Sequence, residues 1–163
     1  GTAIQPLFHA LKYQKIKKAG LMLGEEIGKL AVSKKLNDID FIVPVPLHKA
    51  KLRDRTYNQS EYIAKGIGNI LKAEVINDAV IRSRFTPTQT RLNKAERKVN
   101  VSGAFGINPK YTDKLCGKNI LLTDDVITTG ATILECASAL KAAGSGKICI
   151  CSAAYAELKI NVV

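Results

Sequence analysis

The chain has 163 residues and is strongly basic, with 25 Lys and Arg against 14 Asp and Glu, a formal net charge of +11. Hydrophobic residues make up 46% and charged residues 24%, which is typical of one ordinary globular domain and excludes a disordered chain. The apolar runs are far shorter than the roughly 20 residues of a membrane span. Four cysteines without a Cys-x-x-Cys pair argue against a disulfide framework or a structural zinc site, and favour the cytoplasm.

The positive charge indicates an anionic partner. Residues 47–103 carry twelve basic and five acidic side chains, which is +7 of the total. Most of this excess falls in two predicted loops, 49–55 and 82–98. The lysines of segment 12–18 lie outside both loops and leave a polyanionic partner open as an alternative.

Apolar spacing predicts two helices and two strands in the first half of the chain. In chain order they are a helix from Leu21 to about Lys35, a strand at 40–46, a helix at 59–71 and a strand at 79–82. The first strand is β-branched and closed by prolines, which is typical of a buried strand that runs into a loop. Asn58 or Ser60 is available as the N-cap of the second helix.

The second half begins with a long polar and basic connection, residues 83–103, of a length that is usually functional. It continues with a strong strand at 120–125, a helix at 131–143 closed by Gly144, and an apolar strand at 147–155. Strands that alternate with helices predict an α/β fold, a parallel sheet with both faces covered.

The segment that carries the chemistry is residues 120–132. A strand ends in two carboxylates, Asp124 and Asp125, at the edge where α/β proteins bind ligands. A turn with Thr and Gly then opens directly onto a helix, the layout of a phosphate cradle. Two acids beside a phosphate favour sugar hydroxyls or Mg²⁺ as their partners. The alternative is a structural turn in which the acids cap the helix.

Residues 120–132 resemble the 5-phosphoribosyl-1-pyrophosphate (PRPP) motif of type I phosphoribosyltransferases. The wider chain resembles one branch of them, the competence-associated ComF family. The blocks that carry this resemblance are Val43-Pro44-Val45-Pro46-Leu47-His48 with a basic run into Tyr57-Asn58-Gln59, Thr86-Pro87-x-Gln89-Thr90-x-Leu92, and Arg97-x-x-Asn100-Val101-x-Gly103-Ala104-Phe105. The resemblance implies a three-layer fold with a central, mainly parallel sheet. Residues 1–36 would contribute to a small hood and residues 37–163 would form the core.

The resemblance also implies roles for residues. The acids Asp124 and Asp125 would meet the ribose hydroxyls, and Arg97 would reach the pyrophosphate. The 5-phosphate would be held by Thr128, Thr129, Gly130, Ala131 and Thr132. The pyrophosphate would be held by His48, Lys49, Lys51, Arg53 and Arg55. A flexible loop would carry Arg84, Gln89 and Asn100, for which an anchoring role is the alternative.

The implied cofactor is Mg²⁺, bound through PRPP and, as an open alternative, through Asp124 and Asp125. In ComF relatives a zinc module of paired cysteines usually precedes the lysine-rich segment, and this sequence does not include one. Thr56 stands where the family commonly has Gly. We expect an enzyme that transfers phosphoribosyl to a nitrogenous acceptor. The alternative is a non-catalytic, nucleotide-binding competence protein that acts with single-stranded DNA or partner proteins. Assembly into a homodimer is a further open alternative.

Overall fold

The computed structural model describes residues 17–47, 57–82, 103–153 and 161–162. The helices are α2 (Lys17–Ser33), α4 (Gln59–Leu71), α6 (Thr112–Leu115) and α7 (Ala131–Ala142), with a short 3-10 turn η1 (Pro109–Tyr111). The strands are β1 (Phe41–Pro44), β2 (Glu74–Val75), β3 (Val80–Arg82), β4 (Phe105–Ile107), β5 (Ile120–Asp124), β6 (Ile148–Ser152) and β7 (Asn161–Val162).

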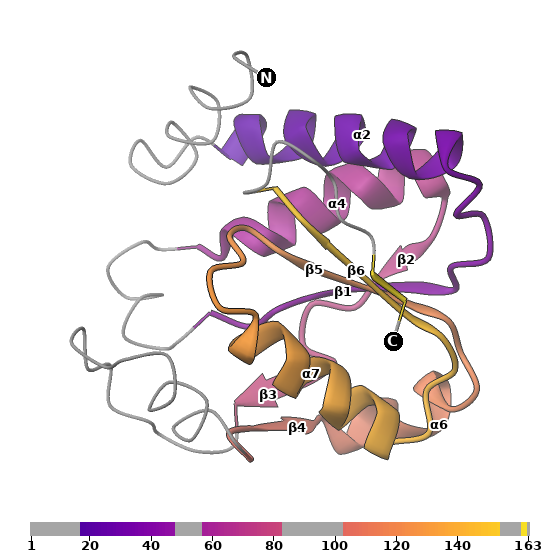
Figure 1. Cartoon of the computed structure of the whole chain (residues 1–163), viewed down its shortest axis with the longest axis vertical. Coiled ribbons are helices and arrows are strands. Elements are labelled where there is room, and N and C mark those ends of the chain that lie inside the picture. Colours follow the sequence, from indigo (N-terminus) through magenta and orange to yellow (C-terminus); the bar gives the residue numbers. More distant parts are fainter. Residues whose placement is uncertain (1–16, 48–56, 83–102, 154–160, 163) are drawn as a thin grey trace.

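Five strands form the central sheet in the order β2-β1-β5-β6-β7. The first four are parallel, and β7 pairs antiparallel with β6 at the edge. Strands β5 and β6, both in the interior of the sheet, are buried along almost their whole length, as expected for strands with both faces covered. All the parallel strands therefore end at one edge, on the left in Figure 1.

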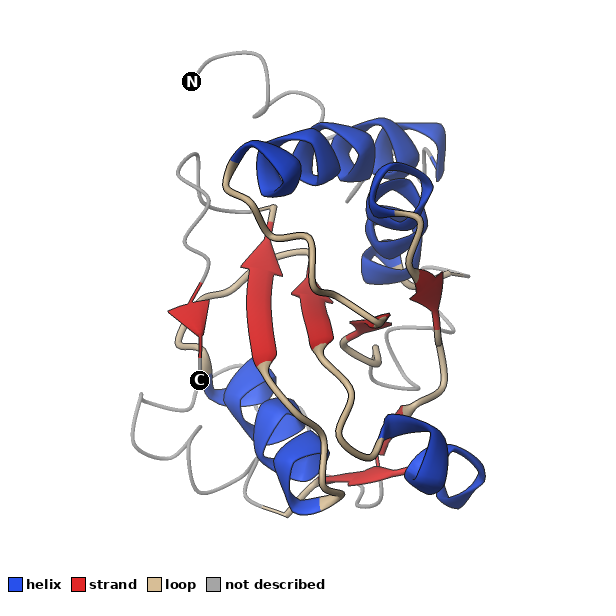
Figure 2. Ribbon diagram, turned by 90° about the vertical axis from the view of Figure 1, so that its right-hand side faces the viewer, coloured by secondary structure: helices blue, strands red, loops and turns tan. Residues whose placement is uncertain are grey.

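Helices cover both faces of this sheet (Figure 1). On one face α4 packs against β1 and β5, and α2 packs along α4. On the other face, α7 and the separate β3-β4 pair enclose a second apolar core. Figure 2 shows the strands between these two helical layers. The prediction of an α/β fold with a parallel sheet covered on both faces is confirmed.

The α2–α4 contact depends on glycine. A Cβ on Gly24 would lie 2.2 Å from the carbonyl oxygen of Ile63, and a Cβ on Gly66 would lie 2.2 Å from that of Leu21. The two backbones therefore approach more closely than any side chain allows. The glycines of α2 at positions 20, 24 and 28 are all buried, and a Cβ on Gly28 would meet the side chain of Ile70 at 2.8 Å.

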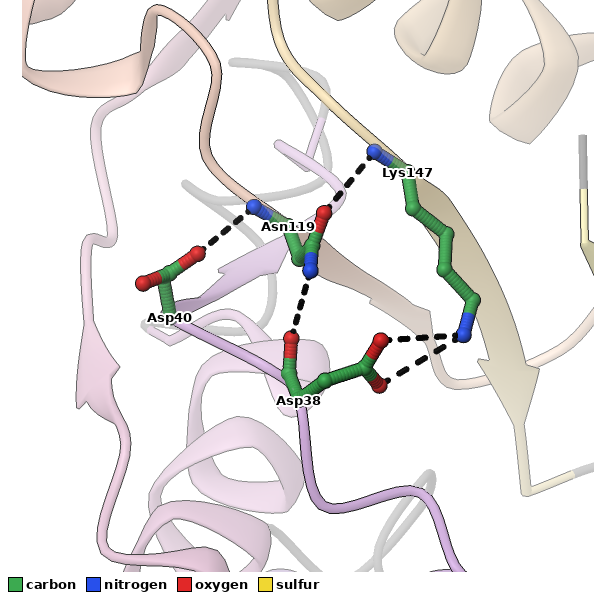
Figure 3. Close-up of polar contacts among 4 residues, drawn as sticks. All are labelled: Asp38, Asp40, Asn119 and Lys147. Carbon is green, nitrogen blue, oxygen red and sulfur yellow. Dashed lines mark hydrogen bonds and ion pairs between the residues drawn. The ribbon is translucent and has the colours of Figure 1, made fainter.

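A polar cluster ties the amino ends of the strands together, opposite the edge where they end (Figure 3). The side chain of Asn119 accepts a hydrogen bond from Lys147 N at 3.0 Å and donates one to the carbonyl oxygen of Asp38 at 2.9 Å. The backbone N–H of Asn119 donates to the Asp40 carboxylate at 2.8 Å. Asn119 thereby connects the segments that lead into β1, β5 and β6.

The structure differs from the predicted elements mainly in its shortest strands. The strand expected at 79–82 is β3, but it pairs antiparallel with β4 in a sheet of its own. The sequence pattern did not predict β2, β4 or β7, each of which is only two or three residues long. No helix of the described ranges is long and apolar enough to cross a membrane. The division at residue 36 into hood and core stays a prediction.

Candidate functional site

The site lies at the edge where the parallel strands end, and it begins at the end of β5. Strand β5 carries four buried residues and then delivers Asp124 and Asp125 to the half-buried edge. A four-residue turn, residues 126–129, connects them to Gly130, the N-cap of α7, whose φ of +78° suits glycine. The structure thus places the acid pair and the start of a helix side by side, as the sequence predicted.

The acid pair is held by a compact set of hydrogen bonds. The Oδ1 atom of Asp124 accepts from the backbone N–H of Asp125 at 2.8 Å and from the hydroxyl of Ser60 at 3.2 Å. The Oδ1 atom of Asp125 accepts from Val126 N at 2.7 Å. Each carboxylate therefore has its own hydrogen-bond donors, although the two residues are adjacent in the chain.

The environment of Asp124 favours its neutral form. Burial, followed by the neighbouring negative charge of Asp125, raises the pKa of Asp124 to about 7. The hydrogen bonds that it accepts from the Asp125 N–H and from Ser60 act in the opposite direction. A carboxyl group with such a pKa can change its charge when a cation or a polar ligand reaches it.

The turn after the acids forms a small hollow at the N-terminus of α7. Its cavity of about 40 Å³ is lined by Asp124 and by every residue from Val126 to Ile133. The first turn of α7 contains no acidic residue, and Gly130 provides no side-chain cap. The hydroxyl of Thr129 accepts a long hydrogen bond, 3.4 Å, from Ala131 N. Backbone N–H groups at a helix start favour an anion, so the geometry suits the phosphate cradle predicted from the threonines.

A string of buried polar side chains joins this site to its neighbours. Asn58 is the N-cap of α4, accepts from Ser60 N at 3.2 Å and donates to the carbonyl oxygen of Val45 at 3.0 Å. Ser152 at the end of β6 donates to the Asp125 carbonyl at 3.4 Å. Of the two predicted N-caps, Asn58 is therefore correct, and Ser60 instead contacts the acids. The sequence gives no sign of this contact, because Ser60 and Asp124 are 64 positions apart.

Several predicted site residues lie outside the described residues. They are His48, Lys49, Lys51, Arg53, Arg55, Arg84, Gln89, Arg97 and Asn100. The described residues carry 13 basic and 11 acidic side chains, whereas the remaining segments carry 12 and three. The described body is therefore nearly neutral, and most of the +11 belongs to the remaining segments, which include the loop at 49–55 predicted to bind pyrophosphate and the loop that carries Arg97.

The described residues provide no metal cage of their own. Within these ranges no group of three or more His, Cys, Asp or Glu side chains could hold a metal ion. Carboxylate oxygens are nevertheless suitable ligands for Mg²⁺, which is commonly bound by one or two carboxylates together with substrate phosphates. Asp124 and Asp125 fit that pattern.

The cysteines and tyrosines near the site are packed. Cys149 and Cys151 are buried in the core under α2 and α4, as expected for packing residues on one side of β6, and burial raises the pKa of Cys151 to about 12. Tyr57 is buried too, and its ring meets that of Tyr62 edge to face at 5.4 Å.

Comparison with solved structures identifies the class of fold. Glutamine PRPP amidotransferase from B. subtilis, complexed with ADP and GMP, superposes with a TM-score of 0.52 at 18% identity, over 80% of this chain and 26% of that enzyme. A structure of the allosteric regulatory enzyme of purine biosynthesis matches equally well, over 25% of its chain. The protein has the type I phosphoribosyltransferase fold, with the acid pair and the helix start at the edge where the parallel strands of its sheet end.

Comparison with curated proteins identifies the family. DNA utilization protein YhgH from Escherichia coli K12 is 30% identical over 155 residues, 91% of this chain and 66% of that protein. Competence protein F from Haemophilus influenzae is 32% identical over 107 residues, 66% of this chain and 46% of that protein. No family model matches the chain. The chain belongs to the ComF family of these two relatives, and it spans less than two thirds of their length.

Proposed function

We propose that this protein is a Mg²⁺-dependent phosphoribosyltransferase that uses PRPP. The observation that carries the proposal is the acid pair Asp124 and Asp125, held beside an open helix N-terminus at the ligand edge of a type I phosphoribosyltransferase fold. Each end of this arrangement matches one part of PRPP. The two parts are the ribose 5-phosphate and the ribose hydroxyls.

The hollow at the start of α7 would bind the 5-phosphate. Residues Thr128 to Thr132 line it and offer hydroxyl groups and backbone N–H groups. The positive end of the helix dipole adds electrostatic attraction for a dianion, and no acid of the first turn opposes it. The phosphate would fix one end of the substrate and leave its anomeric carbon above the sheet edge.

The acid pair would bind the ribose. A sugar hydroxyl donates a hydrogen bond to a carboxylate oxygen, and Asp124 and Asp125 present such oxygens next to the phosphate hollow. When Mg²⁺ is bound, it supplies charge neutralisation on the pyrophosphate oxygens. The basic side chains at 49–55 and Arg97 would add to that neutralisation.

In the reaction the bond between the anomeric carbon and the pyrophosphate oxygen breaks, and a bond from that carbon to a nitrogen of the acceptor forms. The acceptor nitrogen loses a proton to solvent, and pyrophosphate leaves with the bonding electron pair. The transition state has oxocarbenium character, as in glycoside cleavage. The protein holds and orients the two substrates and excludes water from the reacting atoms. None of its side chains acts as a nucleophile.

The test is pyrophosphate release from PRPP and Mg²⁺ in the presence of a panel of nucleobases and amines. We expect acceptor-dependent release by the wild-type chain, and a loss of at least about 100-fold in Asp124→Asn/Asp125→Asn, a magnitude typical of lost electrostatic stabilisation. Absence of both PRPP binding and turnover in the wild type would refute the proposal. PRPP binding without turnover on any acceptor would favour the second candidate.

The second candidate is a competence protein that binds PRPP or nucleotides without catalysis and acts on single-stranded DNA. It is favoured by the names of the relatives, DNA utilization protein YhgH and competence protein F. The basic excess of the chain is compatible with a polyanion. Single-stranded DNA should then bind with an affinity that falls steeply between 50 and about 200 mM salt, because phosphate contacts release counterions. Undetectable or salt-independent binding would contradict this candidate.

A further inference from the structure

We infer that Ser60 is a positioning residue for the ribose site, which sets the Asp124 carboxylate from the first turn of α4. The inference rests on the proposed function, because it assumes that the acid pair receives the ribose hydroxyls. It adds a residue from outside the acid-and-threonine segment and gives the start of α4 a part in the site.

The hydroxyl of Ser60 makes two hydrogen bonds to the acid pair. It donates to Oδ1 of Asp124 at 3.2 Å and accepts from the backbone N–H of Asp125 at 3.1 Å. The same N–H donates to Asp124 Oδ1 at 2.8 Å, so the three groups close a small ring. One hydroxyl therefore fixes both the rotamer of the first acid and the backbone that presents the second.

Ser60 is itself rigidly placed. Its side chain is only 2% exposed, and its backbone N–H donates to Oδ1 of Asn58, the N-cap of α4. Asn58, also buried, donates to the carbonyl oxygen of Val45 just after β1. The end of β1, the start of α4 and the end of β5 are thus connected by one chain of hydrogen bonds. A residue locked in this way can orient its partner to the precision that a sugar site requires.

A structural role alone does not explain the contact. Ser60 is not the N-cap, and Asp125 N already has a partner in Asp124. The carboxylate of Asp124, in contrast, is held in place by the Ser60 hydroxyl and the Asp125 N–H, and it lines the phosphate hollow. Loss of the hydroxyl would release one of these two donors and let the carboxylate turn away from a bound sugar.

The experiment is a double-mutant cycle on ligand affinity, with ribose 5-phosphate and inorganic phosphate as probes in the presence of Mg²⁺. Ser60→Ala should weaken ribose 5-phosphate binding about 2- to 10-fold, the equivalent of one hydrogen bond, and leave phosphate binding unchanged. In the Asp124→Ala background the same substitution should cost less than about twofold, because the acceptor of the Ser60 hydroxyl is gone. Ser33→Ala, an exposed serine at the end of α2, is the matched control.

Hydrogen exchange without ligand provides a second test of the Ser60 contact. Ser60→Ala should speed hydrogen exchange of the Asp125 amide about 2- to 10-fold, with little change at amides of α7. Ser60→Cys keeps a weak donor of similar size and should lie between Ala and wild type in both measurements.

The outcomes are distinguishable. If the wild type binds both probes, three results would overturn the role of Ser60. They are an equal loss of ribose 5-phosphate affinity in both backgrounds, an equal loss of phosphate affinity, and no loss of affinity at all. If the wild type binds neither probe, the proposed function fails and the Ser60 inference fails with it.

Discussion

At the scale of single residues, the most unusual group is the carboxyl of Asp124. It is partly buried at the edge of the sheet beside a second acid, and both effects raise its pKa to about 7. The folded protein therefore binds a proton there that the unfolded chain releases at lower pH. Its contribution to stability is therefore greatest below about pH 4, falls as pH rises toward 7 and is lowest above 7.

The sign of this effect gives a prediction for Asp124→Asn. Since the pKa rises from 3.8 to about 7 on folding, the contribution of Asp124 to stability is complete below about pH 4 and is lost as pH rises through 7. The asparagine variant keeps an acceptor for Ser60 and Asp125 N but has no charge to bury. We expect it to gain stability over the wild type between pH 5 and 8, by up to about 4 kcal/mol.

The measurement is the urea midpoint of both proteins at several pH values without ligand. A difference that does not change with pH would contradict the assignment. The same substitution should weaken ribose 5-phosphate binding, because the residue that lowers stability near neutral pH is also one that the proposed function needs.

At the scale of elements, the closest contact is between α2 and α4. Gly66→Ala would place a methyl group 2.2 Å from the carbonyl oxygen of Leu21 and 2.8 Å from Glu25 N, where only backbone is present to move. The helices must separate, and we expect a loss of about 1–3 kcal/mol despite the better helix propensity of Ala. Gly106→Ala on β4 is the control, because nothing lies within 4 Å of its Cβ. Thermal unfolding of the two variants distinguishes them, and equal melting temperatures would refute the close approach.

The amino edge of the sheet provides a second element-scale prediction. Asn119→Ala removes the acceptor of Lys147 N and the donor to the Asp38 carbonyl, and should cost about 1–2 kcal/mol because two backbone groups lose their partner. Lys147→Gln removes only a partly exposed ion pair to Asp38 and should cost no more than about 0.5 kcal/mol. Denaturant unfolding compares them, and a larger loss in Lys147→Gln would contradict this view of the edge.

At the scale of the whole molecule, charge is divided between a nearly neutral body and basic segments outside the described residues. If the basic segment at 49–55 binds pyrophosphate, replacement of Lys49, Lys51, Arg53 and Arg55 by Gln should weaken pyrophosphate binding about tenfold or more. The matched control removes the same charge from the body, at Lys34, Lys72, Lys110 and Lys141. Titration with pyrophosphate compares the variants, and equal losses would mean that net charge alone attracts the anion.

The fold could be predicted from the sequence wherever local pattern and length were sufficient. The strand at 120–125 and the helix that follows it are long, apolar and bounded by clear signals, so their type and position were correct. The short strands β2, β4 and β7 owe their extended form to the partner strand beside them, and no local signal marks them.

The candidate site divides in the same way. The acids, the threonines and the glycine of residues 124–132 could be recognised from the sequence as a candidate phosphate turn, because they follow one another along the chain. Only the folded structure shows that Ser60 contacts the acids, that Asn58 holds Ser60, and that burial raises the pKa of Asp124. The physical reason is that hydrogen bonds and desolvation depend on distance in space, and folding brings together groups that are 64 positions apart in the chain.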